Sequence, residues 1–339
     1  MGADRMELCL YTDSVPDLTL DEALDLTARI GGTAVEIAAG GQSSAPHMDV
    51  FTLVDDAGQR RQFADAIASR GLRMGAVNCS AWPMHPRAGA RHVEIMEAAV
   101  RLAEQLGVNK IVTMTGNPGE SADARLTNWI FYPWPPENTG LLHRQWDETI
   151  AFWQKFAPFA ADHGIERIAL ELHPLHMVYN VPTLLRLREA VGPVIGANVD
   201  PSHMFWQRMD PAAVVRALGP AVHHVHLKDV EHRAEQLSLA GVLDNRPFTD
   251  PAERAWTFRT VGHGHGTEFW APFIDALAEA GYDDVVSIEN EDPVQDAVEG
   301  VTDAARFIGQ FLWRAVRFAV TGTMDACNRS CGRVGLTRE

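Results

Sequence analysis

The chain has no uninterrupted apolar run long enough to cross a membrane. A spanning helix needs about 18 to 20 consecutive apolar residues, and no such run occurs among the 339 residues. The first residues, MGADRMELCLYTDS, also have no apolar core of the kind found in secretory signal peptides. We therefore expect a cytoplasmic protein with no membrane partner.

Cysteine and basic residues are both scarce. Of the four cysteines, Cys9 and Cys79 fall in predicted strands, where we expect buried reduced thiols. Cys327 and Cys331 near the end of the chain have no second ligand pair nearby, so they do not predict a metal site. The 29 basic residues against 45 acidic ones give a formal net charge of −16. This charge argues against a nucleic-acid partner, because phosphate binding needs clustered lysine and arginine.

Four short apolar runs in the second half of the chain each end in polar residues. They are Ile165–Pro174, Val194–His203, Val222–Glu231 and Val285–Pro293. Their continuous apolar character is typical of strands buried on both faces. Helical patterns follow them, one after an insertion. Strand, polar tip and helix in repeated order predict a parallel barrel whose active site lies at the carboxyl ends of the strands.

The first half of the chain supplies four more units of the same kind. The predicted strands are Met6–Thr12, Thr33–Ala38, Leu72–Cys79 and Lys110–Thr115, and the predicted helices are Asp17–Ile30, Phe51–Arg70, His92–Leu106 and His143–Asp162. The later helices are Pro182–Val191, Asp210–Leu218, Glu268–Gly281 and Ala297–Val320. The sequence therefore predicts an α/β protein: a single (β/α)8 TIM barrel over residues 1–320, followed by a C-terminal tail over 321–339.

Two long insertions interrupt the alternation of predicted strands and helices. Gly116–Leu142 follows the fourth strand and contains the aromatic sequence WIFYPWPP, and His232–Gly262 follows the seventh strand. Loops of this length in a compact fold are typical of lids and binding loops. Two interpretations of the aromatic loop remain open: it lines a substrate site, for example through Trp134, or it covers the barrel surface.

Side-chain alternation indicates which polar residues share the barrel mouth. Side chains two positions apart on a strand point the same way. One inward residue from each of the four later strands would then converge on the barrel axis: Glu171, Asp200, His226 and Glu289. Three carboxylates and one imidazole repel one another unless a cation lies between them. The oxygen-rich set favours one Mn²⁺ ion, with Mg²⁺ or Co²⁺ as alternatives, over a structural zinc.

Other polar residues near the strand ends are candidates for contacts with a substrate. His173 and His224 share the parity of predicted ligands and are expected to reach the pocket. Lys228 is expected either to hold a phosphate or substrate oxygen or to pair with a neighbouring acid. Asn78 ends the third strand. Glu36, inside the second strand, is expected either to line the pocket or to pair within the barrel.

The sequences ELH, NVDPSH, HVHLKD and SIENED together resemble the sugar phosphate isomerase/epimerase family of xylose-isomerase-like TIM barrels. The resemblance covers roughly residues 6 to 318. It implies that the four converging residues bind one divalent ion and that His203 contacts the sugar. It also implies that Glu171 and Glu289 move a proton on opposite faces of the sugar.

Two substrate contacts of the ketose epimerases in this family have no match here. Met177 occupies the position of a glutamate, and His232 occupies that of an arginine. These departures weaken the expectation of a simple free-ketose epimerase, whereas the metal set is complete.

The chemistry of the predicted site gives the same function. Removing a proton from a carbon beside a carbonyl needs a base and a positive charge near the oxygen. Opposed carboxylates and a divalent ion meet both needs. We therefore expect a metal-dependent isomerase or epimerase that acts on a small-molecule sugar or glycoside and forms a homo-oligomer.

Two alternatives remain. The catalytic α subunits of C-glycoside deglycosidases resemble the same barrels and are lyases that act on 3-keto aryl C-glycosides. This resemblance implies a small β subunit as partner, an aglycone near the aromatic loop, and His143 as an acid or base. A non-catalytic sugar-binding barrel is the third possibility, and it would not need two opposed glutamates.

Overall fold

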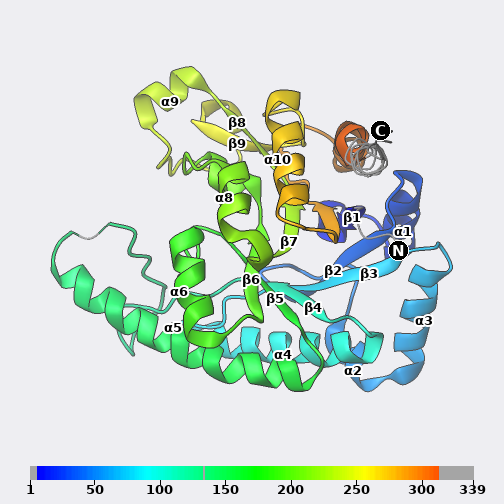
Figure 1. Cartoon of the computed structure of the whole chain (residues 1–339), viewed down its shortest axis with the longest axis horizontal. Coiled ribbons are helices and arrows are strands. Elements are labelled where there is room, and N and C mark those ends of the chain that lie inside the picture. Colours follow the sequence, from blue (N-terminus) through cyan, green and yellow to red (C-terminus); the bar gives the residue numbers. More distant parts are fainter. Residues whose placement is uncertain (1–5, 133, 313–339) are drawn as a thin grey trace, which may run out of the picture.

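In residues 6–132 and 134–312, the part of the chain that the computed structural model describes, eight parallel strands close into a barrel. The strand order around the barrel is β1-β10-β7-β6-β5-β4-β3-β2. The strands are β1 (Glu7–Tyr11), β2 (Ala34–Gly41), β3 (Arg73–Ser80), β4 (Lys110–Thr113), β5 (Arg167–Glu171), β6 (Ile195–Val199), β7 (Val222–Leu227) and β10 (Val285–Ile288). Helices surround them (Figure 1). The predicted (β/α)8 barrel is thus confirmed.

The helices follow the strands in the order that a (β/α)8 barrel requires. They are α1 (Leu20–Arg29), α2 (Val50–Asp55), α3 (Ala57–Ala68), α4 (Gly89–Leu106), α5 (Glu137–Asp162), α6 (Val181–Val191), α7 (Pro201–Phe205), α8 (Pro211–Leu218) and α10 (Thr267–Glu279). A last helix is described over 297–312. The expected continuation of this helix to residue 320 and the tail that follows lie outside the described residues.

Local sequence signals explain where helices begin and end. Thr19 and Glu22 form a capping box at the start of α1. Gly107, in the left-handed conformation with φ of 71°, ends α4. The prediction of one continuous helix over Phe51–Arg70 is wrong, because Asp56 interrupts it. The Asp56 carboxylate accepts hydrogen bonds from the N–H groups of Gly58 and Gln59 and so begins a new helix, α3.

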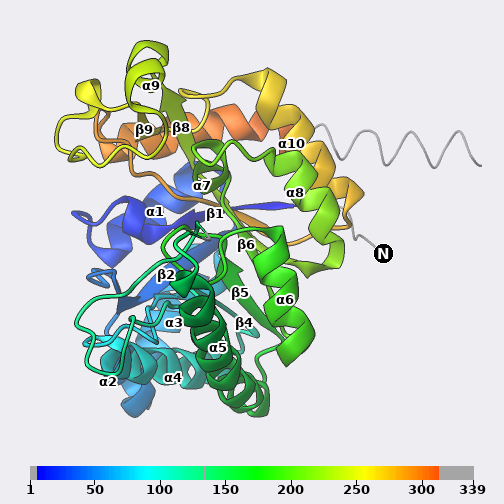
Figure 2. The same cartoon turned by 90° about the vertical axis from the view of Figure 1, so that its left-hand side faces the viewer.

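The second insertion contains structure of its own. Asp229–His232 (β8) and Trp256–Arg259 (β9) pair as a two-stranded antiparallel sheet, and Ala234–Ala240 forms α9 between them. Figure 2 shows this unit at the top of the molecule, away from α4 and α5. Trp256 stacks on Trp206, which follows α7, with ring centroids 5.3 Å apart. The insertion is therefore a packed unit that continues directly from β7.

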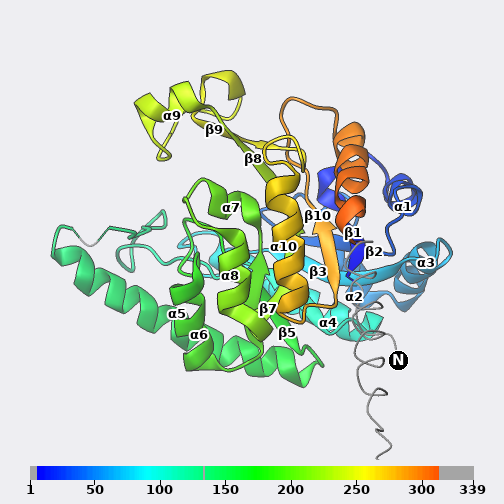
Figure 3. The ribbon, with the colours of Figure 1, turned by 45° about the horizontal axis from the view of Figure 1, so that its top comes forward.

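The first insertion ends earlier than the sequence indicated. Helix α5 starts at Glu137, six residues before the expected His143, and forms the long helix at the lower left of Figure 1. Figure 3 shows α8 and α10 side by side, with β10 next to α10. None of the helices in the described part of the chain is long and apolar enough to cross a membrane.

Candidate metal and substrate site

A cavity of about 310 Å³ lies at the carboxyl ends of the barrel strands. The strand registers bring its polar residues together. Glu171 on β5 pairs in register with Asn198 on β6, and Asn198 pairs with His224 on β7. Since parallel strands in a barrel end at the same face, residues far apart in the sequence share one mouth. The volume falls at the small end of the range for ligand pockets.

The structure brings the four proposed metal ligands together: Glu171, His226 and Glu289 line this cavity, and Asp200 lies beside them. Glu171 ends β5, Asp200 follows β6 as the N-cap of α7, His226 lies on β7, and Glu289 follows β10. One ligand atom from each of them lies within 4.8 Å of the others. Two ligands on opposite sides of an ion with bonds of about 2.1 Å are roughly 4.2 Å apart, so the cluster has the size of a single-ion site.

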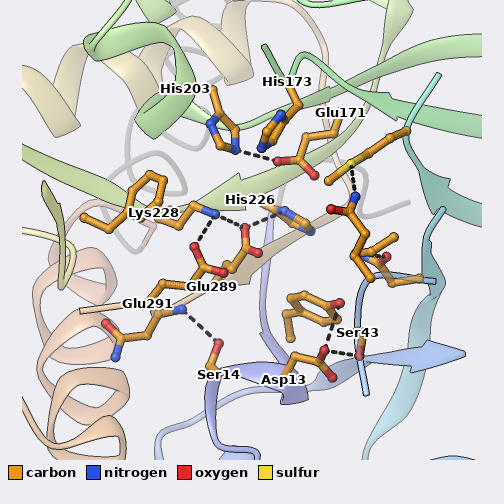
Figure 4. Close-up of a pocket in the computed structure, with 17 residues that line it drawn as sticks. Asp13, Ser14, Ser43, Glu171, His173, His203, His226, Lys228, Glu289 and Glu291 are labelled. Carbon is orange, nitrogen blue, oxygen red and sulfur yellow. Dashed lines mark hydrogen bonds and ion pairs between the residues drawn. The ribbon is translucent and has the colours of Figure 1, made fainter. Parts of the chain in front are cut away.

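Lys228 lies among these carboxylates (Figure 4). Its Nζ atom is 3.0 Å from Glu289 Oε2, 3.3 Å from Asp200 Oδ2 and 3.1 Å from Glu291 Oε2. Burial alone would lower the pKa of Lys228, but these carboxylates raise it well above its ordinary value. Burial would likewise raise the pKa of Glu289, but Lys228 and His226 hold it below its usual range. Both groups are therefore charged at neutral pH.

His226 is held in one orientation from several sides. Its Nε2 atom lies 3.0 Å from Glu36 Oε1, and its Nδ1 atom lies 2.9 Å from Glu289 Oε2 and 3.0 Å from Asn198 Nδ2. The Tyr11 ring stacks on the imidazole with centroids 5.5 Å apart. A carboxylate on the far nitrogen of a ligating histidine is a common way of fixing the ring and its tautomer. Nδ1 is thus the nitrogen available to an ion.

Glu36 lies inside the barrel and does not line the cavity. It is fully buried, and its carboxylate also contacts His224 Nε2 at 2.7 Å and accepts a hydrogen bond from Asn78 Nδ2 at 2.7 Å. Of the two interpretations of Glu36, the structure therefore supports pairing within the barrel rather than contact with a substrate. His224 is fully buried beside it, while Asn78 lines the cavity.

His173 and His203 line the cavity next to Glu171. His203 Nε2 is 2.8 Å from Glu171 Oε1, and the two imidazole rings lie 4.0 Å apart. Burial lowers the pKa of His173 to about 3 and that of His203 to about 4. Both rings are consequently neutral at physiological pH and offer a substrate hydrogen bonds rather than charge.

The side of the cavity across from Glu171 and His203 in Figure 4 was missed from the sequence. It is formed by Asp13 and Ser14, just after β1, and by Ser43, after β2. Asp13 Oδ2 accepts hydrogen bonds from Ser43 Oγ and, at 3.4 Å, from the Tyr11 hydroxyl. A signal was present, because Tyr11 and Asp13 are two positions apart at the end of the first predicted strand, as are Glu171 and His173.

Two proposed site residues lie away from the cavity. His143 is exposed on α5, and Trp134 is 66% exposed just before that helix. Within the aromatic loop, Trp129 contacts Phe131 and Tyr179, with ring centroids 5.0 and 5.2 Å apart, whereas Phe131, Tyr132 and Trp134 are exposed at the surface. This arrangement corresponds to the surface-cover interpretation of the loop.

The second insertion does reach the cavity, through Phe258 on β9. Asp229 anchors the end of this insertion. Its buried carboxylate accepts hydrogen bonds from the backbone N–H groups of Gly262, Gly264 and His265. The GHGHG sequence at residues 262–266 is therefore a turn held by Asp229. Outside this site, His92 is buried, and its Nδ1 atom accepts a hydrogen bond from the Trp82 N–H.

The donor set fits a divalent cation. Asp200 Oδ2 and Glu289 Oε2 are buried, and they share one lysine, Lys228, at 3.3 and 3.0 Å. Burying carboxylates in this way is costly unless a cation compensates them. Oxygen atoms from three carboxylates and one imidazole nitrogen suit Mn²⁺, Mg²⁺ or Co²⁺. A possible site for a divalent cation is therefore part of the structure.

Comparisons with solved structures give the fold. The probable 3-DHS dehydratase AsbF of Bacillus anthracis superposes with a TM-score of 0.64 at 17% identity, covering 89% of this chain and 98% of that one. L-ribulose 3-epimerase gives 0.61 at 18% identity, with coverages of 93% and 97%. D-allulose 3-epimerase from Methylomonas sp. gives 0.59 at 19% identity, with coverages of 91% and 98%.

Sequence comparison gives the family. The uncharacterized protein YfiH of Bacillus subtilis (strain 168) is 37% identical over 311 residues, which cover 91% of this chain and 99% of that protein. The model of the family described as "xylose isomerase-like TIM barrel" matches residues 24–310. This match spans most of the barrel, from α1 to the last described helix. The chain belongs to the xylose isomerase-like TIM barrel family.

Proposed function

We propose that the protein is a divalent-metal-dependent sugar isomerase or epimerase in which Glu171 and Glu289 exchange a proton with the carbon beside a sugar carbonyl. The observation that carries the proposal is the meeting of Glu171, Asp200, His226 and Glu289 at one cavity. Two of the structural relatives named above, L-ribulose 3-epimerase and D-allulose 3-epimerase, bear the names of sugar 3-epimerases, which supports the same class of substrate.

The two glutamates enter the cavity from different strands. Glu171 comes from β5 and Glu289 from the end of β10, and β6 and β7 separate them around the barrel. A sugar between them would present one face to each carboxylate. A proton can then leave one face and return to the other, which inverts that carbon, or return to the neighbouring carbon, which moves the carbonyl.

Glu171, Asp200, Glu289 and Nδ1 of His226 would hold the ion. A divalent cation there supplies positive charge close to a carbonyl oxygen, where negative charge develops as the neighbouring carbon loses its proton. His203 and His173 are both neutral, so each can donate a hydrogen bond to one sugar hydroxyl and accept one from another. Phe258 and Tyr11 add aromatic surface to the cavity lining.

The alternative function, cleavage of aryl C-glycosides, depends on space for an aryl group near the cavity. Trp134 and His143, the residues that would serve it, lie outside the cavity lining. No contact in the described residues favours a lyase over an isomerase. Release of an aglycone from a 3-keto aryl C-glycoside would favour the lyase function over the isomerase or epimerase function.

Solvent isotope exchange tests the proposal. The protein, stripped of metal and reloaded with Mn²⁺, is incubated in D₂O with free aldoses and ketoses, and deuterium on carbon is measured by mass spectrometry. We expect exchange in the reloaded wild type, and a loss of at least about 100-fold in the Glu171→Gln and Glu289→Gln variants at saturating Mn²⁺. Glu299→Gln, an exposed change on the last described helix, is the matched control.

Full exchange after exhaustive chelation would refute the metal requirement. Near-native exchange in either glutamine variant would refute the assignment of the proton-transfer pair. Circular dichroism of each variant separates loss of chemistry from loss of fold.

A further inference from the structure

The charges on the cavity wall are unbalanced. The lining includes the carboxylates Asp13, Glu171, Glu289 and Glu291, and a fifth, Asp200, lies beside Lys228. Among the described residues that line the cavity, Lys228 is the only lysine, and none is an arginine. The carboxylates at this wall thus outnumber its one lysine, and the wall is acidic.

Lys228 is not free to serve an anionic ligand. Its ammonium already contacts Asp200, Glu289 and Glu291 within 3.3 Å. A substrate phosphate that recruited it would break ion pairs in a buried place, where unpaired carboxylates are costly. The neighbouring histidines are also engaged, because His173 Nδ1 contacts the Pro174 carbonyl oxygen and His203 Nε2 lies 2.8 Å from Glu171 Oε1.

Asp13 places negative charge on the side away from Glu171 and His203 (Figure 4). The Tyr11 hydroxyl and Ser43 Oγ both donate to its Oδ2 atom, and this fixes the carboxylate in the wall. The cavity residues near it on β2 and β3 and the loops that follow are uncharged amides and hydroxyls: Gln42, Ser43, Asn78 and Ser80. Such groups bind hydroxyls, whereas phosphate sites use lysine, arginine or a helix N-terminus.

We propose that the substrate is an uncharged polyhydroxylated carbonyl compound, and that Asp13 is the residue that excludes phosphorylated and carboxylated sugars. This proposal rests on the proposed function, whose substrate class it narrows. An anionic group held near Asp13 would meet a like charge at short range in a partly buried site. Repulsion of that kind changes affinity on the order of 100-fold.

Matched pairs of neutral and charged sugars test whether the site prefers uncharged substrates and whether Asp13 causes the preference. Free ketopentoses and ketohexoses are each compared with their own terminal phosphate, and aldoses with the corresponding uronic acids, on Mn²⁺-loaded protein. Binding is measured by calorimetry and deuterium exchange by mass spectrometry. We expect the neutral member of a pair to bind on the order of 100-fold more tightly. Asp13→Asn, which keeps a hydrogen-bond acceptor for Ser43 and Tyr11, is expected to reduce this ratio at least about tenfold.

Asp17→Asn, an exposed change in the same segment, is the control and should leave the ratio unaltered. Asp13→Ser provides a second variant if the asparagine form is unstable. Preference for the charged members, an unchanged ratio in both Asp13 variants, or no binding by either member of any pair would overturn the proposal.

The two proposals fail in different ways. Metal-dependent exchange on phosphorylated sugars would leave the proposed function standing and remove this inference. Selective binding of neutral sugars that depends on Asp13, without any exchange, would leave the inference standing and remove the proposed function.

Discussion

Lys228 Nζ lies 3.0 Å from Glu289 Oε2, an oxygen that we assign to the metal. The same ammonium is 3.3 Å from Asp200 Oδ2, which belongs to a second proposed ligand. Lys228 is buried, and its pKa is raised by these partners, so it carries a full charge. A lysine at this position offsets the repulsion between the carboxylates and competes with a divalent ion for them.

Lys228→Met is therefore expected to increase the affinity for Mn²⁺ by about tenfold or more, since one positive charge is removed from the immediate surroundings of the ion. The variant should also be less stable without metal, because two carboxylates lose their counter-ion. Mn²⁺ should thus raise the melting temperature of the variant more than that of the wild type. Titration calorimetry and thermal unfolding measure both effects. Lys155→Met, on the exposed side of α5, is the control, and weaker Mn²⁺ binding in the Lys228 variant would contradict the assignment.

Glu36→Gln tests whether the buried carboxylate positions His226. Glu36 contacts His226 Nε2 at 3.0 Å and His224 Nε2 at 2.7 Å, and an amide cannot accept from both nitrogens in the same way. Loss of such a partner typically lowers metal affinity by about 10- to 100-fold, and we expect a decrease in this range. Calorimetry with Mn²⁺ measures it. Ser287→Ala removes the 3.2 Å contact to His224 alone and should leave the affinity nearly unchanged; equal effects of the two changes would mean that Glu36 acts only on the fold.

Asp284 provides a pH-dependent contribution to stability at the opposite end of the barrel. Burial would raise its pKa, but the ion pair with Lys110 at 2.8 Å lowers the pKa from 3.8 to about 2. A carboxyl whose pKa is depressed by folding stabilises the protein above its unfolded pKa. This stabilisation, about 2 kcal/mol by linkage, is lost as the pH falls from about 4 through about 2.

Asp284→Asn leaves Lys110 buried without its partner and is expected to lower the free energy of unfolding by roughly 3 kcal/mol at pH 7. The difference from wild type should shrink as the pH is lowered from about 5 toward 2.5. Denaturant unfolding across this range measures the trend. Asp283→Asn, an exposed neighbour, serves as the reference. An equal loss at every pH would show that the asparagine disturbs packing rather than an ion pair.

Much of the site could be predicted because its residues lie at or just after the ends of predicted strands. Glu171, Asp200, His226 and Glu289 stand at or just beyond the ends of strands whose apolar pattern is clear in the sequence. Since neighbouring strands of a barrel end at one face, the strand ends predict a shared mouth.

Contacts across the interior could not be predicted in the same way. Whether Glu36 meets His226 depends on the shear of the closed barrel, which places β2 across the interior from β7. Likewise, the break at Asp56 is set by a single side chain that caps α3 within an otherwise helical pattern. The position of Trp129 in the aromatic loop could not be predicted either, because its contact Tyr179 is about fifty positions away in the sequence.

The position of β10 between β1 and β7 has a consequence for assembly. It is the last strand among the described residues, and it carries Glu289 to a cluster whose other members come from β5, β7 and the end of β6. A chain that has not yet inserted this strand has an open ring and only part of its coordination sphere. A bound cation should therefore stabilise the closed barrel much more than folding intermediates in which β10 is not yet in place.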